Sequence, residues 1–219
     1  MRLSDRSALV LASASPRRKE LLADLGLPFE VAPSSSDESL VAAVPTATAV
    51  QLLAEKKAAA VAARYPDTFV LGVDTMVDLD GEPMGKPEDA EAARSMLRRL
   101  SGRRHRVFSG LSLHRGQFVR TLVVATEVTM RRYTNDEIEQ TIACGSPFDK
   151  AGSYAIQDEM FHPVQSLDGC YCNVMGLPMW TVWRLLRDLA FSAQLQRPDA
   201  CRPVCAKCPL RALPEGGGC

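Results

Sequence analysis

Three cations occupy a position where a helix normally carries acidic residues. In the stretch LASASPRRKELL, residues 11–22, a serine and a proline are typical of an N-cap and a first turn, and Arg17, Arg18 and Lys19 follow at once. The free N–H groups of a helix start are electropositive, so three cations there are unfavourable by roughly a few tenths of a kcal/mol each. A bound anion would reverse this, because it accepts the N–H groups and neutralises the guanidinium groups. The alternative is that the cations project into water, and this stretch alone favours neither interpretation.

A carboxylate and a lysine are the next candidates for chemistry. Asp74 lies within FVLGVDTMVDL, residues 69–79, a mostly apolar segment that predicts a strand, and a carboxylate there needs a partner or a metal ion. The alternative is that Asp74 lies near the strand end and is solvated. Lys57 falls near the apolar face of a predicted helix over residues 46–64, where it either points into a cleft or snorkels to water along its stem.

The elements that must position these residues alternate between helices and strands. An apolar first strand over residues 8–12 precedes the cationic helix, which buries three leucines at positions 21, 22 and 25. Interleaved helices and hairpins predict an α/β or mixed α+β fold around a mixed central sheet. The further predicted elements are a turn at Asp80-Gly81, a helix from Pro87 to Leu100, two long strands within 105–133 joined by a turn at 114–117, a short helix from about Thr134 and a last helix over 178–195.

Composition and charge exclude several classes of protein. The chain has 219 residues and 46% hydrophobic content, which is enough for one large folded domain. Its 26 basic and 26 acidic residues give a formal net charge of zero, so we expect no nucleic acid polymer and no membrane as partner. No apolar run approaches the roughly 20 residues that span a bilayer, and the stretch at 8–12 is too short for a signal peptide. A P-loop, G-x-x-x-x-G-K-[ST], is absent.

The seven cysteines lie in the second half of the chain. Their odd number and low density argue against a disulfide-stapled secreted scaffold and predict free thiols in a reducing cytoplasm. We expect residues 1–196 to form the folded domain and residues 197–219, rich in Cys, Pro and Gly, to form a flexible tail outside the core. The default for the tail is disorder with reduced thiols. The alternative is a zinc or iron–sulfur site with C-x₃-C-x₂-C spacing, whose ligands would be Cys201, Cys205, Cys208 and Cys219.

Eight short motifs occur in an order that resembles the Maf family. The similarity covers roughly residues 8–190, and residues 161–163 (Phe-His-Pro) depart from the family pattern beside the expected base-recognition residue. The motifs are LASASPRRKELL (11–22), Asp37-Glu38, LAEKKA (53–58), GVDT (72–75), GKP (85–87), SGRRHRV (101–107), DKAGSYAIQ (149–157) and NVMGLPM (173–179).

The resemblance implies a fold and a reaction. Maf proteins are nucleoside triphosphate pyrophosphatases related in fold to the inosine triphosphatases, with a central mixed sheet, flanking helices and a cleft between two lobes. They hydrolyse a nucleoside triphosphate to the monophosphate and pyrophosphate with a divalent metal cation, Mg²⁺ or Mn²⁺. Cations and a metal placed around the leaving pyrophosphate would stabilise its developing negative charge.

The motif positions imply a role for each candidate residue. Ser13, Arg17 and Arg18 would lie in the phosphate-binding segment, which agrees with the cationic helix start. Glu38 and Asp74 would hold the metal and activate water, with Asp74 as the base. Lys57 and Lys86 would contact the triphosphate.

Base preference divides the family, and Arg18, Thr75 and Gln157 match the group that acts on dTTP and UTP. The amide of Gln157 offers a donor and an acceptor, as a pyrimidine edge requires, whereas an acidic side chain there would suit a purine. The resemblance therefore implies a house-cleaning enzyme for dTTP, UTP and modified relatives, and a homodimer. The alternatives are a 7-methyl-GTP pyrophosphatase and a non-catalytic, nucleotide-binding regulator of septum formation.

Overall fold

The computed structural model describes residues 9–34, 44–191 and 195–212, which are built around one mixed sheet. The strand order is β2-β1-β3-β5-β6-β7, and β4 pairs with β3 beside this path. β1 runs parallel to β2 and β3, and the other pairs are antiparallel, so the predicted mixed sheet is confirmed. The strands are β1 Leu9–Leu11, β2 Phe29–Val31, β3 Phe69–Leu79, β4 Glu82–Met84, β5 Arg104–Arg115, β6 Phe118–Met130 and β7 Val164–Asp168.

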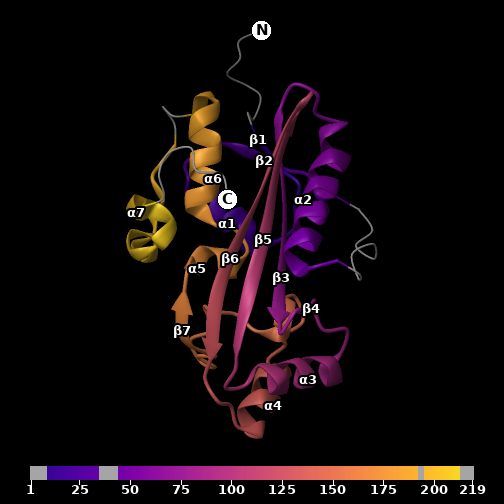
Figure 1. Ribbon diagram of the computed structural model, residues 1–219, viewed down its shortest axis with the longest axis vertical. Coiled ribbons are helices and arrows are strands. Elements are labelled where there is room, and N and C mark those ends of the chain that lie inside the picture. Colours follow the sequence, from indigo (N-terminus) through magenta and orange to yellow (C-terminus); the bar gives the residue numbers. More distant parts are fainter. Residues whose placement is uncertain (1–8, 35–43, 192–194, 213–219) are drawn as a thin grey trace.

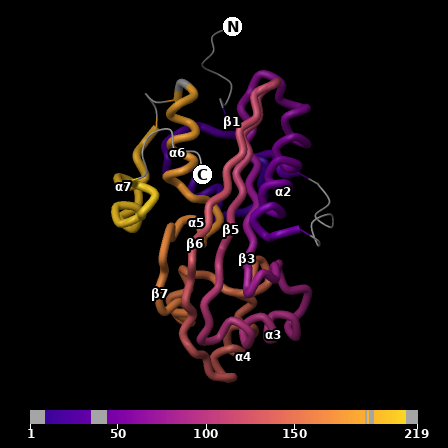
Figure 2. Tube along the Cα trace, in the orientation of Figure 1, coloured from indigo at the N-terminus to yellow at the C-terminus, as the bar shows by residue number. Residues whose placement is uncertain are grey.

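Helices flank the long strands on both sides (Figure 1). α2 lies along one side of β3 and β5, while α1 and α6 lie on the other side. α3 and α4 cover the end of the β5–β6 hairpin that lies opposite its turn. The tube in Figure 2 shows that this hairpin runs almost the whole length of the molecule. None of the described helices is long and apolar enough to cross a bilayer. The helices are α1 Pro16–Ala23, α2 Thr46–Ala62, α3 Ala90–Leu100, α4 Asn135–Ala143, α5 Tyr171–Met175, α6 Met179–Leu186 and α7 Pro198–Cys201.

The two largest of the buried clusters define two lobes of the molecule. The larger cluster joins β1, α1, α5 and α6 to one half of the long strands. The smaller one joins α3 and α4 to the other half. β3 supplies Leu71 to the first and Val77 to the second, so a single strand passes through both lobes and can carry a residue to the boundary between them.

Element boundaries follow local chemistry. β3 has the predicted bounds, and Asp80 and Gly81 then turn the chain with φ of 58° and 88°. α3 begins at Ala90, three residues later than predicted, because the Asp89 side chain accepts an N–H of the first turn and caps the helix there. The predicted helix over 178–195 is shorter, since α6 passes into a π-helical turn at 187–191.

The C-terminal segment, defined here as residues 198–212, differs from the expectation of a tail outside the core. It forms α7 and two 3-10 turns, Pro203–Lys207 and Pro209–Ala212, beside α6. Its thiols at positions 205 and 208 are buried in the larger cluster, and the indole N–H of Trp180 donates to the carbonyl of Cys205 at 3.0 Å. Arg202 forms ion pairs with Glu20 and with Asp24. Buried sulfur and these polar anchors hold the segment on the domain.

Two glycines let α2 lie directly on the sheet. A Cβ on Gly72 would lie 2.2 Å from the carbonyl oxygen of Ala54, and one on Gly110 would lie 2.1 Å from that of Val50. Backbone atoms of a packed helix cannot yield by that much, so a larger side chain would push α2 away from the strands.

We expect Gly72→Ala to lower the free energy of unfolding by at least about 1–3 kcal/mol, because it overpacks this contact. Urea unfolding of the two proteins measures the difference. Gly85→Ala is the control, since a Cβ there would meet no atom within 4 Å, and its stability should stay within about 0.5 kcal/mol of the parent. Equal losses in the two variants would show that the close approach of α2 is not the cause.

Candidate active site

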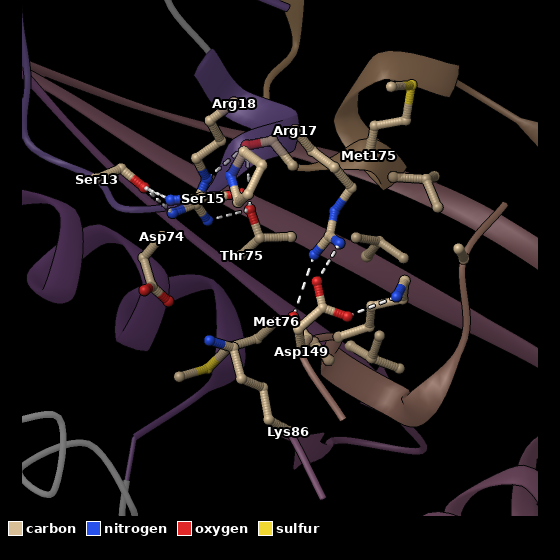
Figure 3. A pocket seen from close by; sticks show the side chains of 18 of the residues that line it. Ser13, Ser15, Arg17, Arg18, Asp74, Thr75, Met76, Lys86, Asp149 and Met175 are labelled. Atoms are coloured by element: carbon tan, nitrogen blue, oxygen red, sulfur yellow. Dashed lines mark hydrogen bonds and ion pairs between the residues drawn. The ribbon is translucent and has the colours of Figure 1, made fainter. Parts of the chain in front are cut away.

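A pocket of about 560 Å³ opens between the two lobes (Figure 3), as the predicted cleft requires. Its walls come from the start of α1, the middle of β3, the segment at 149–157 and the turn after α5. Glu38, a predicted metal ligand, lies outside the described residues. The predicted site residues that line the pocket are Ser13, Arg17, Arg18, Lys57, Asp74, Thr75, Lys86 and Gln157.

The start of α1 faces this pocket and keeps its electropositive character. Its first turn contains no acidic side chain, and the Ser15 side chain makes no capping hydrogen bond. The Ser13 hydroxyl, 7% exposed, instead accepts the backbone N–H of Ser15 at 3.3 Å. The helix start is thus arranged as an anion-binding end rather than a self-capped one.

Arg18 links three segments of the chain through hydrogen bonds. Its Nε donates to the carbonyl of Gly176 at 3.0 Å, and one terminal nitrogen donates to the Ser13 hydroxyl and to the carbonyl of Val73, both at 3.0 Å. The other terminal nitrogen donates to the Thr75 hydroxyl at 3.0 Å. The guanidinium therefore joins α1, β3 and the turn after α5, and this geometry favours a positioning role over direct contact with phosphate.

Arg17 points the other way, toward Asp149 (Figure 3). One terminal nitrogen lies 2.6 Å from the Asp149 carboxylate, and the other donates to the Asp149 carbonyl at 3.1 Å. Lys150 also pairs with this carboxylate at 2.5 Å. Although burial alone would raise the pKa of Asp149, hydrogen bonds from Lys150 and Arg17 lower it below its ordinary value. Two cations and one acidic residue thus meet at the pocket wall.

Asp74 and Lys57 form an ion pair at the pocket. Lys57 Nζ lies 2.5 Å from a carboxylate oxygen of Asp74, and their side chains are 12% and 8% exposed. Period two along β3 places Asp74 on the same face as Gly72, which is the face that α2 covers, so the lysine on α2 reaches it directly. The solvated alternative for Asp74 is wrong, because the carboxylate is buried and paired.

The remaining predicted residues differ in exposure. Lys86 and Gln157 are exposed at the pocket wall, where their side chains can reach a ligand. The Thr75 hydroxyl, by contrast, accepts from Arg18 and lies 2.8 Å from the Ser109 hydroxyl. Thr75 therefore contributes to the polar framework under the pocket.

Comparison with known proteins identifies the family of this chain. Residues 8–189 match the family described as Maf-like protein. The chain belongs to the Maf family. It is 50% identical over 204 residues to the dTTP/UTP pyrophosphatase of Thermomicrobium roseum, covering 92% of this chain and 93% of that protein. It is 49% identical over 183 residues to the dTTP/UTP pyrophosphatase of Moorella thermoacetica, covering 82% and 94%. A solved structure, protein VC0702 from Vibrio cholerae, matches with a TM-score of 0.44 at 10% identity and covers 84% of this chain and 96% of that one.

Sequence reasoning missed three groups at this candidate site. Asp149 and Lys150 stand in the motif DKAGSYAIQ, but the pairing of Asp149 with Arg17 spans 132 positions and leaves no local signal. Lys150 pairs with the same Asp149 carboxylate. The carbonyl of Gly176 anchors Arg18, and a main-chain acceptor cannot be recognised from residue types. Tyr154 lines the pocket and lies 2.7 Å, through its hydroxyl, from Nε2 of the buried His105.

The His105–Tyr154 pair predicts an acid-sensitive lobe. Burial lowers the pKa of His105 from 6.5 to about 4. Between these values the unfolded chain binds a proton that the folded chain does not, so stability is complete above pH 6.5 and falls as the pH drops toward 4. At about 1.4 kcal/mol for each pH unit, the loss attributable to this group is about 3 kcal/mol.

We expect His105→Gln to remove this contribution to the pH dependence of the free energy of unfolding between pH 6.5 and 4. Urea unfolding at each pH measures the free energy. A His105 variant with the parent's slope would mean that the histidine is protonated equally in both states.

Proposed function

We propose that this protein hydrolyses nucleoside triphosphates between the α and β phosphates and releases the monophosphate and pyrophosphate, with dTTP, UTP and modified relatives as substrates. The observation that carries the proposal is the buried Asp74–Lys57 pair beside a cationic, uncapped helix start in one pocket. The names of the relatives from Thermomicrobium roseum and Moorella thermoacetica support the same reaction.

The first turn of α1, Arg17 and Lys86 bind the anionic part of the substrate. N–H groups and side-chain cations at one wall suit a triphosphate, whose oxygens accept from both. Arg17 exchanges the Asp149 carboxylate for phosphate oxygens when substrate enters, so one charge-assisted contact replaces another. Ser13 and Arg18 hold this wall against β3.

Asp74 is the base that accepts a proton from the attacking water. A buried carboxylate needs compensation, and Lys57 supplies it while lying in reach of the triphosphate. Water attack then expels pyrophosphate, whose developing charge is stabilised by the cations of α1 and by Lys86.

The donor set fits a hard divalent cation, Mg²⁺ or Mn²⁺. Such ions are often held by one or two carboxylates together with substrate phosphates, and Asp74 offers one carboxylate at the pocket. Among the residues that the structure describes, no group of three or more His, Cys, Asp or Glu side chains is arranged to hold a metal. Glu38 and the triphosphate would complete the coordination. When bound, the cation neutralises charge on the leaving pyrophosphate.

Gln157 reads the base. Its amide lies exposed at the pocket wall and offers both a donor and an acceptor, which match the carbonyl and N–H of a thymine or uracil edge. Thr75 acts through Arg18, which it helps to hold. The enzyme works as a cytoplasmic house-cleaning homodimer, with residues 1–196 as its catalytic domain.

Pyrophosphate release from a nucleotide panel tests the proposal. The panel contains dTTP, UTP, CTP, ATP, GTP, 7-methyl-GTP and modified uridine triphosphates, each with Mg²⁺ or Mn²⁺. We expect turnover of dTTP, UTP and their relatives. Turnover of 7-methyl-GTP alone would keep the reaction but overturn the role of Gln157, and no turnover of any nucleotide would support the non-catalytic regulator of septum formation.

A further inference from the structure

Four buried thiols from two distant segments meet in the larger buried cluster beside α5. Cys170 and Cys172 flank the start of α5, and Cys205 and Cys208 belong to the C-terminal segment. Their exposed fractions range from 0% to 7%, and all four belong to the larger buried cluster. The C-terminal segment therefore places its C-x₂-C pair directly on the C-x-C pair of α5.

The thiols approach one another in two pairs. The Sγ atoms of Cys172 and Cys205, 33 positions apart in the sequence, lie 3.5 Å from each other. Cys170 and Cys208 also interact, since each shifts the pKa of the other. Within residues 9–34, 44–191 and 195–212, no set of three or more His, Cys, Asp or Glu is positioned as metal ligands. The close contact between the Sγ atoms of Cys172 and Cys205 favours chemistry between two sulfurs at a time.

In both pairs the pKa of the thiol on the C-terminal segment is lowered and that of its partner beside α5 is raised. The Cys172 thiol lowers the pKa of Cys205, and the Cys170 thiol lowers that of Cys208, while the pKa values of Cys172 and Cys170 are raised. The thiolate, which is the attacking species in disulfide exchange, is thus favoured on the C-terminal segment. Cys208, at 7%, is the most exposed of the four.

We propose that Cys170–Cys208 and Cys172–Cys205 are two disulfide-forming pairs, which on oxidation fasten the C-terminal segment to α5. The oxidant is a low-molecular-weight disulfide, RSSR. The Cys208 thiolate attacks one sulfur of RSSR and releases RS⁻, which takes up a proton to give RSH. Cys170 then loses its proton, its sulfur attacks the Cys208 sulfur of the mixed disulfide, and the second RS⁻ that leaves takes up that proton as RSH. A second RSSR oxidises Cys172 and Cys205 by the same two steps, so each protein disulfide reduces one RSSR to two RSH.

The expected consequence is a more stable, covalently closed C-terminus. A disulfide that closes a loop of this length restricts the unfolded chain, and two of them should raise Tm by about 5–15 °C. The sulfurs must approach by about 1.5 Å to reach bonding distance, which rotation of buried side chains can supply.

Tryptic mapping of the full chain tests this pairing. The protein is first incubated with glutathione disulfide, and the remaining thiols are then alkylated. Trypsin does not cut before Pro198 or Pro203, so Cys205 falls in peptide 188–207 and Cys208 in peptide 208–211, while both α5 cysteines fall in peptide 151–184. We expect one assembly of all three peptides, and four of the seven thiols protected from alkylation.

Single variants resolve the two bonds. Cys172→Ser should leave only 151–184 joined to 208–211, and Cys170→Ser only 151–184 joined to 188–207. Cys144→Ser and Cys201→Ser, outside the pairs, are the matched controls and should keep the parent pattern and the rise in Tm.

Two results would overturn the inference. Thiols that stay fully alkylated after oxidation would show that the pairs do not form bonds. About one zinc ion per purified chain, lost in Cys172→Ser and Cys205→Ser but retained in the controls, would show that the four thiols are metal ligands instead. Neither readout involves nucleotide hydrolysis, so the outcome is independent of the proposed function.

Discussion

Replacing Asp74 by Asn should lower kcat for pyrophosphate release by about 10²–10⁴-fold while the fold persists. Asn has the same shape but cannot accept the proton of an attacking water and offers a weaker metal ligand. The carboxylate is 8% exposed, lies 2.5 Å from Lys57 and belongs to the pocket wall. Steady-state kinetics with dTTP and UTP measure the loss.

Asp78 supplies a matched control for Asp74. It is a second buried carboxylate on β3, but it pairs with Arg106 and accepts from Thr46, away from the pocket lining. Asp78→Asn should reduce stability and leave kcat of the folded enzyme within about twofold. A kcat for Asp74→Asn within tenfold of the parent would remove Asp74 from the role of base.

The Asp74–Lys57 pair should also behave as a unit. If the lysine acts mainly by compensating the carboxylate, Lys57→Met lowers kcat on its own but adds little to the loss already caused by Asp74→Asn. A double-mutant cycle in kcat/KM measures this coupling. Strictly additive losses would mean that Lys57 contacts the triphosphate without depending on Asp74.

Periodicity predicted those parts of the site that depend on neighbours in sequence. The apolar run over residues 69–79 predicted the bounds of β3, and period-two counting placed Asp74 on the same face as Gly72. The same reasoning left the surroundings of Asp74 and Lys57 open, because a side chain near an apolar face can either snorkel or pair. The packing of α2 over Gly72 decides between snorkelling and pairing. A contact between two segments that are distant in sequence cannot be recognised from the neighbours of either residue.

The C-terminal segment shows where composition misleads. Pro, Cys and Gly are typical of a tail, and the spacing of its own cysteines suggested that they act together. In the fold Cys205 and Cys208 instead meet Cys172 and Cys170, two residues that the sequence places in a different motif. Spacing within one segment cannot reveal a partner on another, so the alternative metal set of Cys201, Cys205, Cys208 and Cys219 could not include Cys170 and Cys172. Cys219 lies outside the described residues.

Arg18→Lys should lower the free energy of unfolding by about 2–4 kcal/mol and kcat/KM by about 10²-fold. Lysine keeps the charge but cannot reproduce the fork that binds Ser13, Val73, Thr75 and Gly176 at once, and each lost charge-assisted hydrogen bond costs about 1.5–3 kcal/mol before relaxation. Loss of the fork frees the start of α1 from β3, and a shift of about 1 Å between phosphate site and base can cost about 10²-fold in rate.

Arg17→Lys separates this positioning role from substrate binding. Arg17 pairs with an Asp149 side chain that is 56% exposed, and such a pair contributes at most about 1 kcal/mol. We therefore expect its unfolding free energy within about 1 kcal/mol of the parent and a rise in KM, whereas Arg18→Lys loses both stability and kcat. Urea unfolding and steady-state kinetics on both variants decide the matter. If Arg18→Lys leaves the unfolding free energy unchanged and only raises KM, Arg18 is a direct phosphate ligand. The four hydrogen bonds of its guanidinium would then contribute little to stability.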